Sequence, residues 1–596
     1  PRMGNREGEV LLVSQRFRAR GMVAFAAAAL LVALPASALA AKPAQAPNSV
    51  DVQLVAFNDF HGNLLPPGGS SGRVGSVAND AACTAANNCA FAGGVEYLAD
   101  DVKNLRAANP NTLVVSAGDN IGASPLISAA FHDEPTIEAL NELGLDVSAV
   151  GNHEFDEGVS ELLRIQNGGC NPTDGCQTGH TYAGANFQFL AANVVYKSTG
   201  QPILPAYTTK IVGGVKVGII GLTLKGTPQI VSAAGIQNVD FLDEATTINA
   251  AAHALRQDGV KTIVVLLHEG GAQSVPLSTA MINTCSGMSG AVTDIVHHLD
   301  TTVDMVISGH THNAYNCMLP NSAEVPIPVT SASSFGRLVT DIDLKINTKS
   351  GRPTSISVNN QVVVRDTKDA NETALVNYYN AAVAPIANVV VGSITGDITQ
   401  TNNLAGESAL GDVIGDAQMA YTSGAGSQLA FMNPGGIRTS LTFNQISGGE
   451  LPGQVTFGEA FTVQPFNNLV VTQDMTGQQI KDTLEQSWQG CFGRTQANVI
   501  LQVSSTFHYS YDATQPCGSR ILSTTLNGTP LSMTTTYKVA MNNFLADGGD
   551  SFPGFRAGTN RVNQPGFDVD ALTQYLGAHT PPGVSPGPQD RITKVN

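Results

Sequence analysis

Short apolar runs alternate with amphipathic segments between Val50 and about Ile346. The runs are rich in β-branched and aliphatic residues and predict buried strands, while the segments between them have the apolar spacing of helices. The predicted strands are Val52–Phe57, Thr112–Ser116, Val147–Val150, Val215–Ile220, Thr262–Leu267 and Met305–Ile307. The predicted helices are Gly94–Arg106, Pro135–Leu143, Ala245–Gln257 and Ala291–Leu299. This alternation predicts an α/β domain.

A second region follows with a different order of elements. Residues Val339–Ile346 alternate apolar and polar positions as an edge strand does, and Glu372–Asn388 has the pattern of a helix that connects two domains. Beyond it we predict a helix at Ala409–Tyr421 and strands at Leu429–Asn433, Leu469–Gln473 and Tyr537–Asn542. The Pro- and Gly-rich segment Pro581–Gly587 predicts a loose tail.

The length and composition agree with two folded domains. A chain of 596 residues is too long for one core. Only 13% of its residues are charged and 42% are apolar, which excludes a disordered chain. We divide it into a signal peptide (1–40), a catalytic domain (49–364), a linker helix (365–388), a C-terminal domain of the α+β class (389–570) and a tail (571–596).

The first forty residues have the pattern of a secretory signal. Arg16, Arg18 and Arg20 precede an apolar run from Met22 to Leu34, and the small-residue triplet Ala38-Leu39-Ala40 follows. A retained membrane anchor is the alternative, but the run is short for a span of about 20 residues. We therefore expect cleavage near Ala40 and a periplasmic or extracellular protein.

The net charge argues against polymeric or membrane partners. The chain carries a formal charge of −17, and removal of residues 1–40 takes away five Arg and two Glu and leaves −20. An acidic exterior disfavours binding to nucleic acid and to anionic lipid. We expect a small-molecule substrate, no nucleic acid polymer and no stable membrane anchor, and the sequence leaves the oligomeric state open.

The eight cysteines suggest disulfides. They form sequential couples, as an exported chain with stapled surface loops would have: Cys83/Cys89, Cys170/Cys176, Cys285/Cys317 and Cys491/Cys517. Eight cysteines allow about 105 pairings, so pairing of nearest neighbours is only the simplest of them. A zinc site is the alternative, although the chain has no Cys-x-x-Cys pair.

Residues that bind metals follow five of the apolar runs. Asp59, His61, Asp119 and His268 stand at the ends of three predicted strands, and Asn152, His310 and His312 follow two more. Because strand ends meet at one edge of a sheet, these side chains can form one cluster. Imidazole and carboxylate ligands around a bridging aspartate are typical of centres in which two divalent ions activate water for phosphate chemistry.

Spacing within these segments supports the same interpretation. Asp59 and His61 are two residues apart, as are His310 and His312, and period-two geometry places such pairs on one side of an extended chain. Asp119 follows Gly118, which permits close backbone approach, and is the candidate bridging ligand. A single histidine at a strand end is more often structural. A metal site is favoured because five segments of the chain each end in residues that bind metals. We interpret seven other histidines as ordinary surface or packing residues, namely His132, His180, His253, His297, His298, His508 and His579.

At these motifs the chain resembles the secreted 5′-nucleotidase family of calcineurin-like metallophosphatases, which includes UDP-sugar hydrolases and 2′,3′-cyclic-nucleotide phosphodiesterases. The matching segments are Asn58–Asn63, Ser116–Asp119, Gly151–Asp156, His268–Gly270 and Gly309–His312. The resemblance implies a four-layer α/β/β/α catalytic domain followed by a separate substrate-binding domain. It implies one metal site of Asp59, His61, Asp119 and His312, and a second of Asp119, Asn152, His268 and His310.

The resemblance also implies a catalytic pair, His153 and Asp156. The carboxylate would orient the imidazole, which stabilises the phosphoryl oxygens or protonates the leaving group. A structural alternative is that Asp156 caps a helix that starts near Glu157. The identity of the two divalent ions does not follow, although zinc, manganese and cobalt suit mixed nitrogen and oxygen ligands.

Three segments of the second domain resemble the nucleotide-binding segments of the family. The resemblance implies that Phe466 and Phe544 sandwich the base, that Asp550 binds the ribose and Asn433 the base edge, and that Arg438 binds an anionic or ribose oxygen. Without the resemblance, both phenylalanines would be interpreted as core residues. The chain departs from the family at Gly406, where many members have an arginine.

Together these features predict an exported enzyme that removes phosphate from nucleoside 5′-monophosphates by attack of metal-bound hydroxide. One alternative is a 2′,3′-cyclic-nucleotide phosphodiesterase or a nucleotide-sugar or diphosphate hydrolase. Another is a secreted nucleotide-binding or surface-interaction protein without useful turnover.

Overall fold

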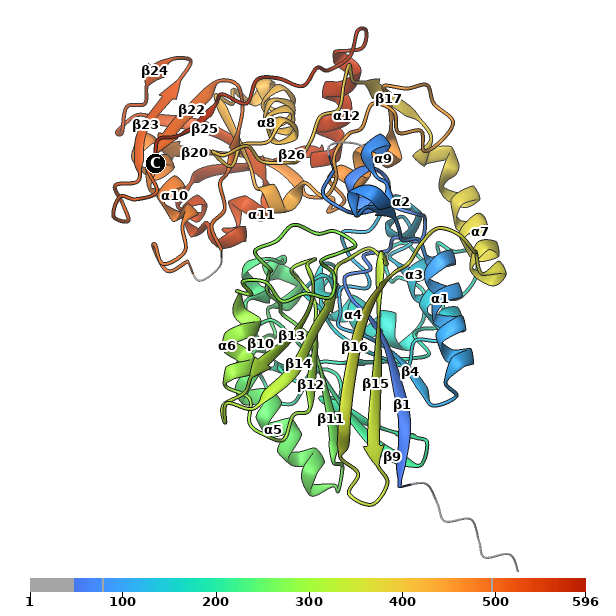
Figure 1. Ribbon diagram of the computed structural model, residues 1–596. Coiled ribbons are helices and arrows are strands. Elements are labelled where there is room, and N and C mark those ends of the chain that lie inside the picture. The colour runs from blue at the N-terminus through green and yellow to red at the C-terminus, as the bar shows by residue number, and fades with distance from the viewer. Residues whose placement is uncertain (1–47, 78–79, 495–496) are drawn as a thin grey trace, which may run out of the picture. The chain divides into compact units, whose positions relative to one another are not determined.

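The computed structural model describes residues 48–77, 80–494 and 497–596 (Figure 1). The predicted signal peptide at 1–40 lies outside these residues. Within the described residues, no helix has both the length and the apolar character that a membrane span requires.

The N-terminal domain contains two six-stranded sheets (Figure 1). In order across the first sheet, the strands are β16 (Pro353–Val362), β15 (Leu338–Asn347), β1 (Ser49–Phe57), β4 (Thr112–Ser116), β5 (Val147–Ala149) and β6 (Gln188–Leu190). In order across the second, they are β13 (Ala314–Pro320), β14 (Pro326–Ala332), β12 (Met305–Ser308), β11 (Thr262–His268), β9 (Val215–Thr223) and β8 (Tyr207–Val212). Parallel pairing joins β1 to β4 in the first sheet and joins β11 to both β9 and β12 in the second. The carboxyl ends of these strands therefore point the same way within each sheet.

The two sheets pack face to face and helices cover their outer faces. Leu54 and Val115 of the first sheet and Ile219 and Leu266 of the second share one buried cluster. Helices α1 (Val95–Ala108), α3 (Glu134–Leu143) and α4 (Val159–Asn167) contribute to the core outside the first sheet. Helices α5 (Glu244–Gln257) and α6 (Ala291–His297) contribute to the core outside the second. The expected α/β/β/α order of layers is confirmed.

Helix α7 (Ala370–Ala387) leads into the C-terminal domain, which has an α+β fold. A five-stranded sheet is formed by β21 (Gln502–Val503), β18 (Leu429–Met432), β25 (Thr536–Asn542), β20 (Leu469–Thr476) and β26 (Thr559–Phe567). A four-stranded sheet is formed by β24 (Thr529–Pro530), β23 (Ile521–Leu526), β22 (Phe507–Tyr511) and β27 (Ile592–Lys594). Its helices are α8 (Ala409–Tyr421), α9 (Phe457–Val463), α10 (Gly477–Leu484), α11 (Asn543–Ala546) and α12 (Asp568–Ala578).

Short elements complete the description. They are α2 (Leu126–Ala129) and the strands β2 (Arg73–Val74), β3 (Ala90–Phe91), β7 (Val194–Tyr196), β10 (Val239–Phe241), β17 (Val390–Ser393) and β19 (Gln454–Thr456). The pairs β2–β3, β7–β10 and β17–β19 each form a two-stranded sheet.

Two sequence expectations differ from the structure. The strand predicted at the sheet edge, β15, lies between β1 and β16, and it alternates because Ile342 and Leu344 enter the core while the opposite face meets solvent. The expected tail is also wrong in part, because α12 crosses residue 570 and β27 pairs in parallel with β22. The other domain boundaries stay predictions.

All four nearest-neighbour disulfides are present. The bonded pairs are Cys83–Cys89, Cys170–Cys176, Cys285–Cys317 and Cys491–Cys517. No free cysteine occurs among the described residues. The simplest pairing is therefore confirmed, and the zinc alternative is wrong because every cysteine sulfur is used in a disulfide.

Candidate metal and catalytic site

The predicted metal ligands meet where strands of both sheets end. Five of them, which are the Asp and His residues at 59, 61, 119, 310 and 312, have φ between +49° and +71°. This left-handed region is costly for residues other than glycine, and such strain concentrates at functional sites. The chain turns sharply after each strand and directs these side chains toward one another.

Asp59, His61 and His312 form one group of donor atoms, which lie within 4.8 Å of one another. His61 Nε2 is 3.1 Å from His312 Nε2, and His312 Nε2 is 3.4 Å from Asp59 Oδ1. His61 Nδ1 donates to the carbonyl oxygen of Gly122 at 2.8 Å, so in the neutral ring the lone pair is on Nε2, which faces the other donor atoms. Burial holds the pKa of His61 well below its ordinary value, which keeps the imidazole in the form that binds metals.

Asp119, His268 and His310 form a second group with the same 4.8 Å limit. His268 Nδ1 donates to the carbonyl oxygen of Ala117 at 2.7 Å, and His268 Nε2 is 2.9 Å from Asp119 Oδ2. That Nε2 is fully buried and makes no hydrogen bond of acceptable geometry within the described residues. His310 Nδ1 is 3.0 Å from the side-chain oxygen of Asn152. A buried nitrogen of this kind among carboxylate and amide oxygens fits a divalent cation.

Asp119 lies between the two groups. Its Oδ2 atom is 2.9 Å from His268 and 3.7 Å from His61 Nε2, and its Oδ1 atom accepts the backbone N–H of His153 at 2.9 Å. The structure thus brings all seven predicted ligands into one cluster.

Two neighbours that we did not single out from the sequence hold this cluster in place. Asn58 donates to Asp59 Oδ2 at 2.6 Å, and its side-chain oxygen accepts the N–H of Ala332 at 2.8 Å. The buried carboxylate of Glu154 accepts the backbone N–H groups of Asp119 and Asn120 at 3.0 and 2.8 Å, and also that of Gly151. Both residues lie inside the matching motifs, but spacing alone gave no signal for their roles.

His153 and Asp156 form the predicted pair. His153 Nδ1 is 2.8 Å from Asp156 Oδ2. Burial alone would lower the pKa of His153, but the charges of Asp156 and Asp119 outweigh it and raise that pKa. The alternative that Asp156 caps the next helix is wrong, because α4 begins at Val159 and its N-cap is Gly158.

Arg438 and Phe466 lie beside this pair. The guanidinium carbon of Arg438 is 5.8 Å from the centroid of the Phe466 ring. That ring stacks on His153, with centroids 5.7 Å apart and planes inclined by 21°. Burial lowers the pKa of Arg438, and the charges of Asp119 and Asp156 oppose that shift, so the cation faces the acidic cluster.

The remaining predicted substrate residues form a separate cluster. Asn433 Nδ2 donates to Asp550 Oδ2 at 2.7 Å, and Asn542 Nδ2 donates to the side-chain oxygen of Asn433 at 3.0 Å. Phe544 is half-buried against Gly549, where an added Cβ would lie 2.5 Å from its ring atoms. Phe466 and Phe544 make no ring contact with each other.

Gly406, the position that departs from the family, has a positive φ of 81°. A Cβ added there would lie 2.8 Å from Ile500, so the local backbone and packing both favour glycine. The structure therefore gives a physical reason why an arginine is not accommodated here.

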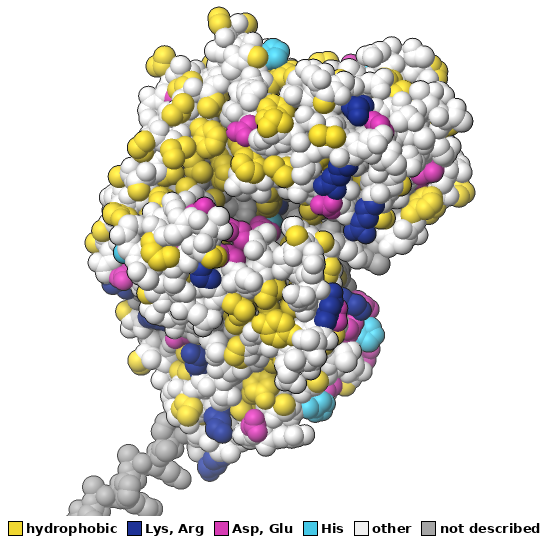
Figure 2. All heavy atoms as spheres, turned by 180° about the vertical axis from the view of Figure 1, so that it is seen from behind, with side chains coloured by type: hydrophobic (Ala, Val, Ile, Leu, Met, Phe, Trp, Pro, Cys, Tyr) yellow, Lys and Arg dark blue, Asp and Glu magenta, His cyan; other side chains and the backbone are white. Residues whose placement is uncertain are grey.

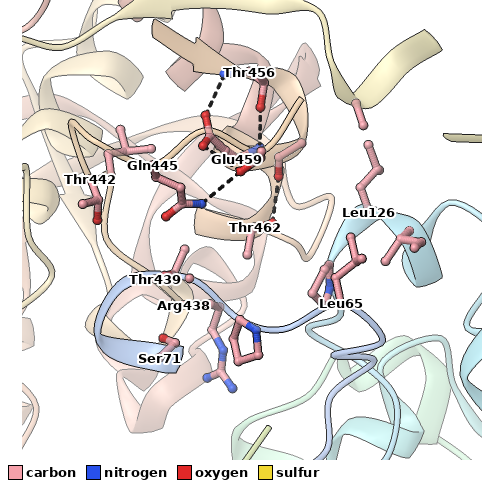
Figure 3. A pocket seen from close by; sticks show the side chains of 18 of the residues that line it. Leu65, Ser71, Leu126, Arg438, Thr439, Thr442, Gln445, Thr456, Glu459 and Thr462 are labelled. Atoms are coloured by element: carbon pink, nitrogen blue, oxygen red, sulfur yellow. Dashed lines mark hydrogen bonds between the residues drawn. The ribbon is translucent and has the colours of Figure 1, made fainter. Parts of the chain in front are cut away.

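Two cavities are lined by predicted catalytic or substrate-binding residues. One of about 310 Å³ is lined by His153, Asp156 and Phe466. The other, of about 180 Å³, is lined by Arg438, Thr439, Thr442 and Glu459, with Leu65 and Leu126 on its opposite side (Figure 3). Figure 2 shows acidic side chains gathered beside a hollow on the face opposite the view of Figure 1.

Comparison with known proteins agrees with this geometry. Residues 53–314 match the family model described as calcineurin-like phosphoesterase, and residues 390–557 match that of the 5'-nucleotidase, C-terminal domain. The crystal structure of the 5'-nucleotidase precursor from Thermus thermophilus is similar, with 25% identity and a TM-score of 0.73, over 92% of this chain and 100% of that chain.

Two curated relatives are more similar in sequence. Cell wall protein Lmo0130 of Listeria monocytogenes is 31% identical over 581 residues, which cover 92% of this chain and 70% of that protein. Endonuclease YhcR of Bacillus subtilis is 32% identical over 499 residues, which cover 82% of this chain but only 37% of that protein. The phosphoesterase and nucleotidase domains follow each other in the order that the resemblance implies. The chain belongs to the 5′-nucleotidase family of calcineurin-like phosphoesterases and is a metal-dependent phosphoester hydrolase.

Proposed function

We propose that the protein is an exported phosphohydrolase that removes phosphate from nucleoside 5′-monophosphates. The contact series Arg438, Phe466 and His153 carries this proposal. It places a cation suited to phosphate and an aromatic face suited to a base next to the imidazole of the predicted catalytic pair.

The donor atoms suit two divalent cations. Asp59, His61, Asp119 and His312 would hold one of them, and Asp119, Asn152, His268 and His310 would hold the other. Zinc, manganese and cobalt all accept such mixed ligands. When bound, the ions supply positive charge for the phosphoryl group and an activated water.

The chain's own residues would perform the remaining steps. With Nδ1 of His153 held by Asp156, its other ring nitrogen is available to hydrogen-bond a phosphoryl oxygen or to protonate the leaving oxygen of the ribose. Arg438 would bind a phosphoryl oxygen through its fork of N–H donors. These interactions would become stronger as negative charge develops on the phosphoryl oxygens. A contact lowers the activation barrier only if it is stronger in the transition state than in the ground state.

Nucleoside recognition would come from the C-terminal domain. Phe466 and Phe544 offer aromatic faces to a base, and stacking tolerates any base. Asp550, which Asn433 orients at 2.7 Å, would accept the ribose hydroxyls, and Asn433 itself would contact the base edge. We therefore expect activity on purine and pyrimidine monophosphates alike.

Export is supported by the four disulfides, because such bonds persist in oxidising compartments. Cleavage of a signal peptide near Ala40 is part of this proposal. N-terminal sequencing of the protein recovered outside the cytoplasm tests it, and a mature protein that starts well before Met22 would contradict it.

The substrate proposal is tested by phosphate release from AMP, 2′,3′-cyclic AMP and UDP-glucose, before and after complete metal removal. We expect AMP to give the highest kcat/KM, activity to vanish with chelator, and zinc, manganese or cobalt to restore it. A preference for the cyclic nucleotide or the nucleotide sugar would overturn the substrate class. Turnover that survives complete metal removal would overturn the mechanism.

Phosphodiester cleavage is the second candidate, because the 32% identical relative is an endonuclease by name. Adding a single-stranded oligonucleotide to the same substrate series distinguishes phosphodiester cleavage from hydrolysis of monophosphates, because only the former cleaves the oligonucleotide internally. Our proposal expects no internal cleavage, since the acidic exterior disfavours a polyanion.

A further inference from the structure

A segment of the C-terminal domain that follows α10 is fixed at two points, Glu485 and Cys491. The disulfide Cys491–Cys517 joins it to the loop before β23. The buried carboxylate of Glu485 accepts the backbone N–H groups of Gly518 and Ile521 at 3.0 and 2.7 Å. The described residues from Glu485 to Cys491 are therefore joined to β23 and to the loop before it.

This segment places Arg494 under the loop that carries Asp550. Arg494 is only 3% exposed, and its guanidinium carbon lies 4.9 Å from the centroid of the Phe552 ring. Its Nη1 atom donates to the carbonyl oxygen of Asp550 at 2.7 Å, and its Nε atom donates to that of Ala497 at 2.9 Å. The guanidinium thus connects the disulfide-closed segment to the Asp550 backbone.

The Asp550 loop needs such support. Asp550 and Ser551 have φ of +50° and +60°. Both therefore lie in the left-handed region, which costs free energy for residues other than glycine. A second contact reaches the same loop, because the side-chain oxygen of Gln486 accepts the N–H of Gly554 at 3.0 Å. Contacts from the neighbouring segment therefore reach the strained loop at the Asp550 carbonyl oxygen and at the Gly554 N–H group.

The charge of Arg494 acts on the same carboxylate. Burial raises the pKa of Asp550, and this shift is opposed by the hydrogen bond from Asn433 and by the charges of Arg494 and Arg438. An ionised carboxylate accepts hydrogen bonds only, which is the form suited to ribose hydroxyls.

We propose that Arg494 is a positioning residue for nucleoside recognition: it fixes the left-handed backbone of Asp550, and the Cys491–Cys517 disulfide holds it in place. This inference rests on the proposed role of Asp550 in binding the ribose. Arg494 would act through Asp550, so its loss should affect substrates that carry a nucleoside and spare those that do not.

The experiment compares AMP with p-nitrophenyl phosphate, a phosphomonoester without a nucleoside. For Arg494→Lys, which keeps the charge but loses the planar fork, we expect KM for AMP to rise about tenfold with kcat nearly constant. The kcat/KM for p-nitrophenyl phosphate should fall less than about twofold. Equal losses for both substrates, or no loss for AMP, would overturn the inference.

Arg520→Lys is the matched control. Arg520 lies 5.3 Å from the Trp488 ring and donates to the carbonyl oxygen of Gln515, but it does not contact the Asp550 loop. It should leave both substrates unaffected. A rise in KM for AMP equal to that of Arg494→Lys would mean that any arginine of this region has the effect, and would overturn the assignment to Arg494.

Asp550→Asn separates the inference from the proposed function. If it raises KM for AMP selectively while Arg494→Lys does not, only the positioning role is wrong. If Asp550→Asn has no selective effect, the proposed ribose contact and the inference both fail.

The double variant Cys491→Ser with Cys517→Ser tests the same connection without changing Arg494. We expect a selective rise in KM for AMP, in the direction of Arg494→Lys. The pair Cys83→Ser with Cys89→Ser removes another disulfide and should have no such effect. Identical kinetics for the two double variants would contradict the role of the Cys491–Cys517 disulfide.

Discussion

The carboxylate of Glu154 accepts the backbone N–H of Asp119 at 3.0 Å. It also accepts the N–H groups of Asn120 and Gly151, so one buried side chain joins the loop after β4 to the loop after β5. Burial and the nearby charge of Asp119 raise the pKa of Glu154 to about 7. The candidate bridging aspartate is therefore held by a residue outside the predicted set of metal ligands.

Glu154→Gln should weaken metal binding. The amide keeps one acceptor oxygen but turns an NH₂ group toward backbone donors, so the loop of Asp119 must shift. Residues that orient ligands typically change metal affinity by about 10- to 100-fold. We expect less metal after dialysis, measured by atomic emission, and activity that returns at high added metal.

Glu324→Gln is the control for that experiment. Glu324 is an exposed carboxylate in the loop between β13 and β14, and it belongs to no group of metal-binding side chains among the described residues. It should retain metal like the parent protein. If Glu154→Gln also does so and keeps full activity, the Glu154 contacts do not position Asp119.

The ligand positions could be predicted because strand ends are visible in the sequence. Hydrophobic runs such as Thr262–Leu267 stop at a polar residue, and parallel pairing of β9, β11 and β12 brings such ends to one edge. The left-handed backbone at Asp59 and Asp119 could not be predicted, because local preference argues against it. Tertiary contacts such as those of Asn58 and Glu154 impose it.

Unrecognised strand partners explain the errors at the domain ends. The alternation of apolar and polar residues in β15 shows that one face of the strand is buried. It does not show that β16 pairs with the edge of β15 that β1 leaves open. Likewise the Pro- and Gly-rich segment before Ile592 carries no sign that β27 will join β22. The partner of β27 is distant in sequence, and β16 was not recognised as a strand. The residue pattern within one strand does not identify the strand that pairs with it.

Asp156→Asn should lower kcat and spare nucleotide binding. The substitution removes the charge that lies 2.8 Å from His153 Nδ1 and leaves the side-chain shape nearly unchanged. Loss of the imidazole itself in His153→Ala should cost about 10²- to 10⁴-fold in kcat, and Asp156→Asn should cost less. Steady-state kinetics with AMP and calorimetric binding of AMP measure the two effects.

The double variant His153→Ala with Asp156→Asn tests whether the two residues act as a unit. Its kcat should equal that of His153→Ala, because Asp156 has nothing to orient once the imidazole is gone. Asp174→Asn, in another His–Asp pair with His132, should keep the parental rate. Multiplicative losses in the double variant would show that the two side chains act independently.

Phe544→Ala and Phe466→Ala should both weaken nucleotide binding. Stacking contributes about 1–3 kcal/mol for each base, so KM for AMP, GMP and UMP should rise by about 5- to 150-fold with little dependence on the base. Phe466→Ala should also change kcat, since its ring stacks on His153. Phe91→Ala, at a ring that is 40% exposed in the N-terminal domain, is the control and should leave KM unchanged.

Glu372→Gln should change the pH dependence of stability. Glu372 lies in α7, where its side chain is fully buried. Burial, with repulsion from Asp369, Glu142 and Glu96, raises its pKa from 4.5 to about 9. The unfolded chain therefore releases this proton at low pH, whereas the folded chain keeps it until about pH 9.

The sign follows from that difference in bound protons. Between about pH 4.5 and pH 9 the folded state holds one more proton than the unfolded state at this site, so Glu372 makes stability fall as pH rises. Gln is neutral at every pH and removes this contribution. We expect the Tm of Glu372→Gln to match the parent near pH 5 and to exceed it by about 2–4 °C near pH 8.5. Thermal unfolding between pH 5 and pH 8.5 measures this Tm difference. The variant Glu324→Gln, at an exposed position, is the control and should show no such dependence on pH. A Tm difference that stays constant with pH would show that no buried proton resides on Glu372.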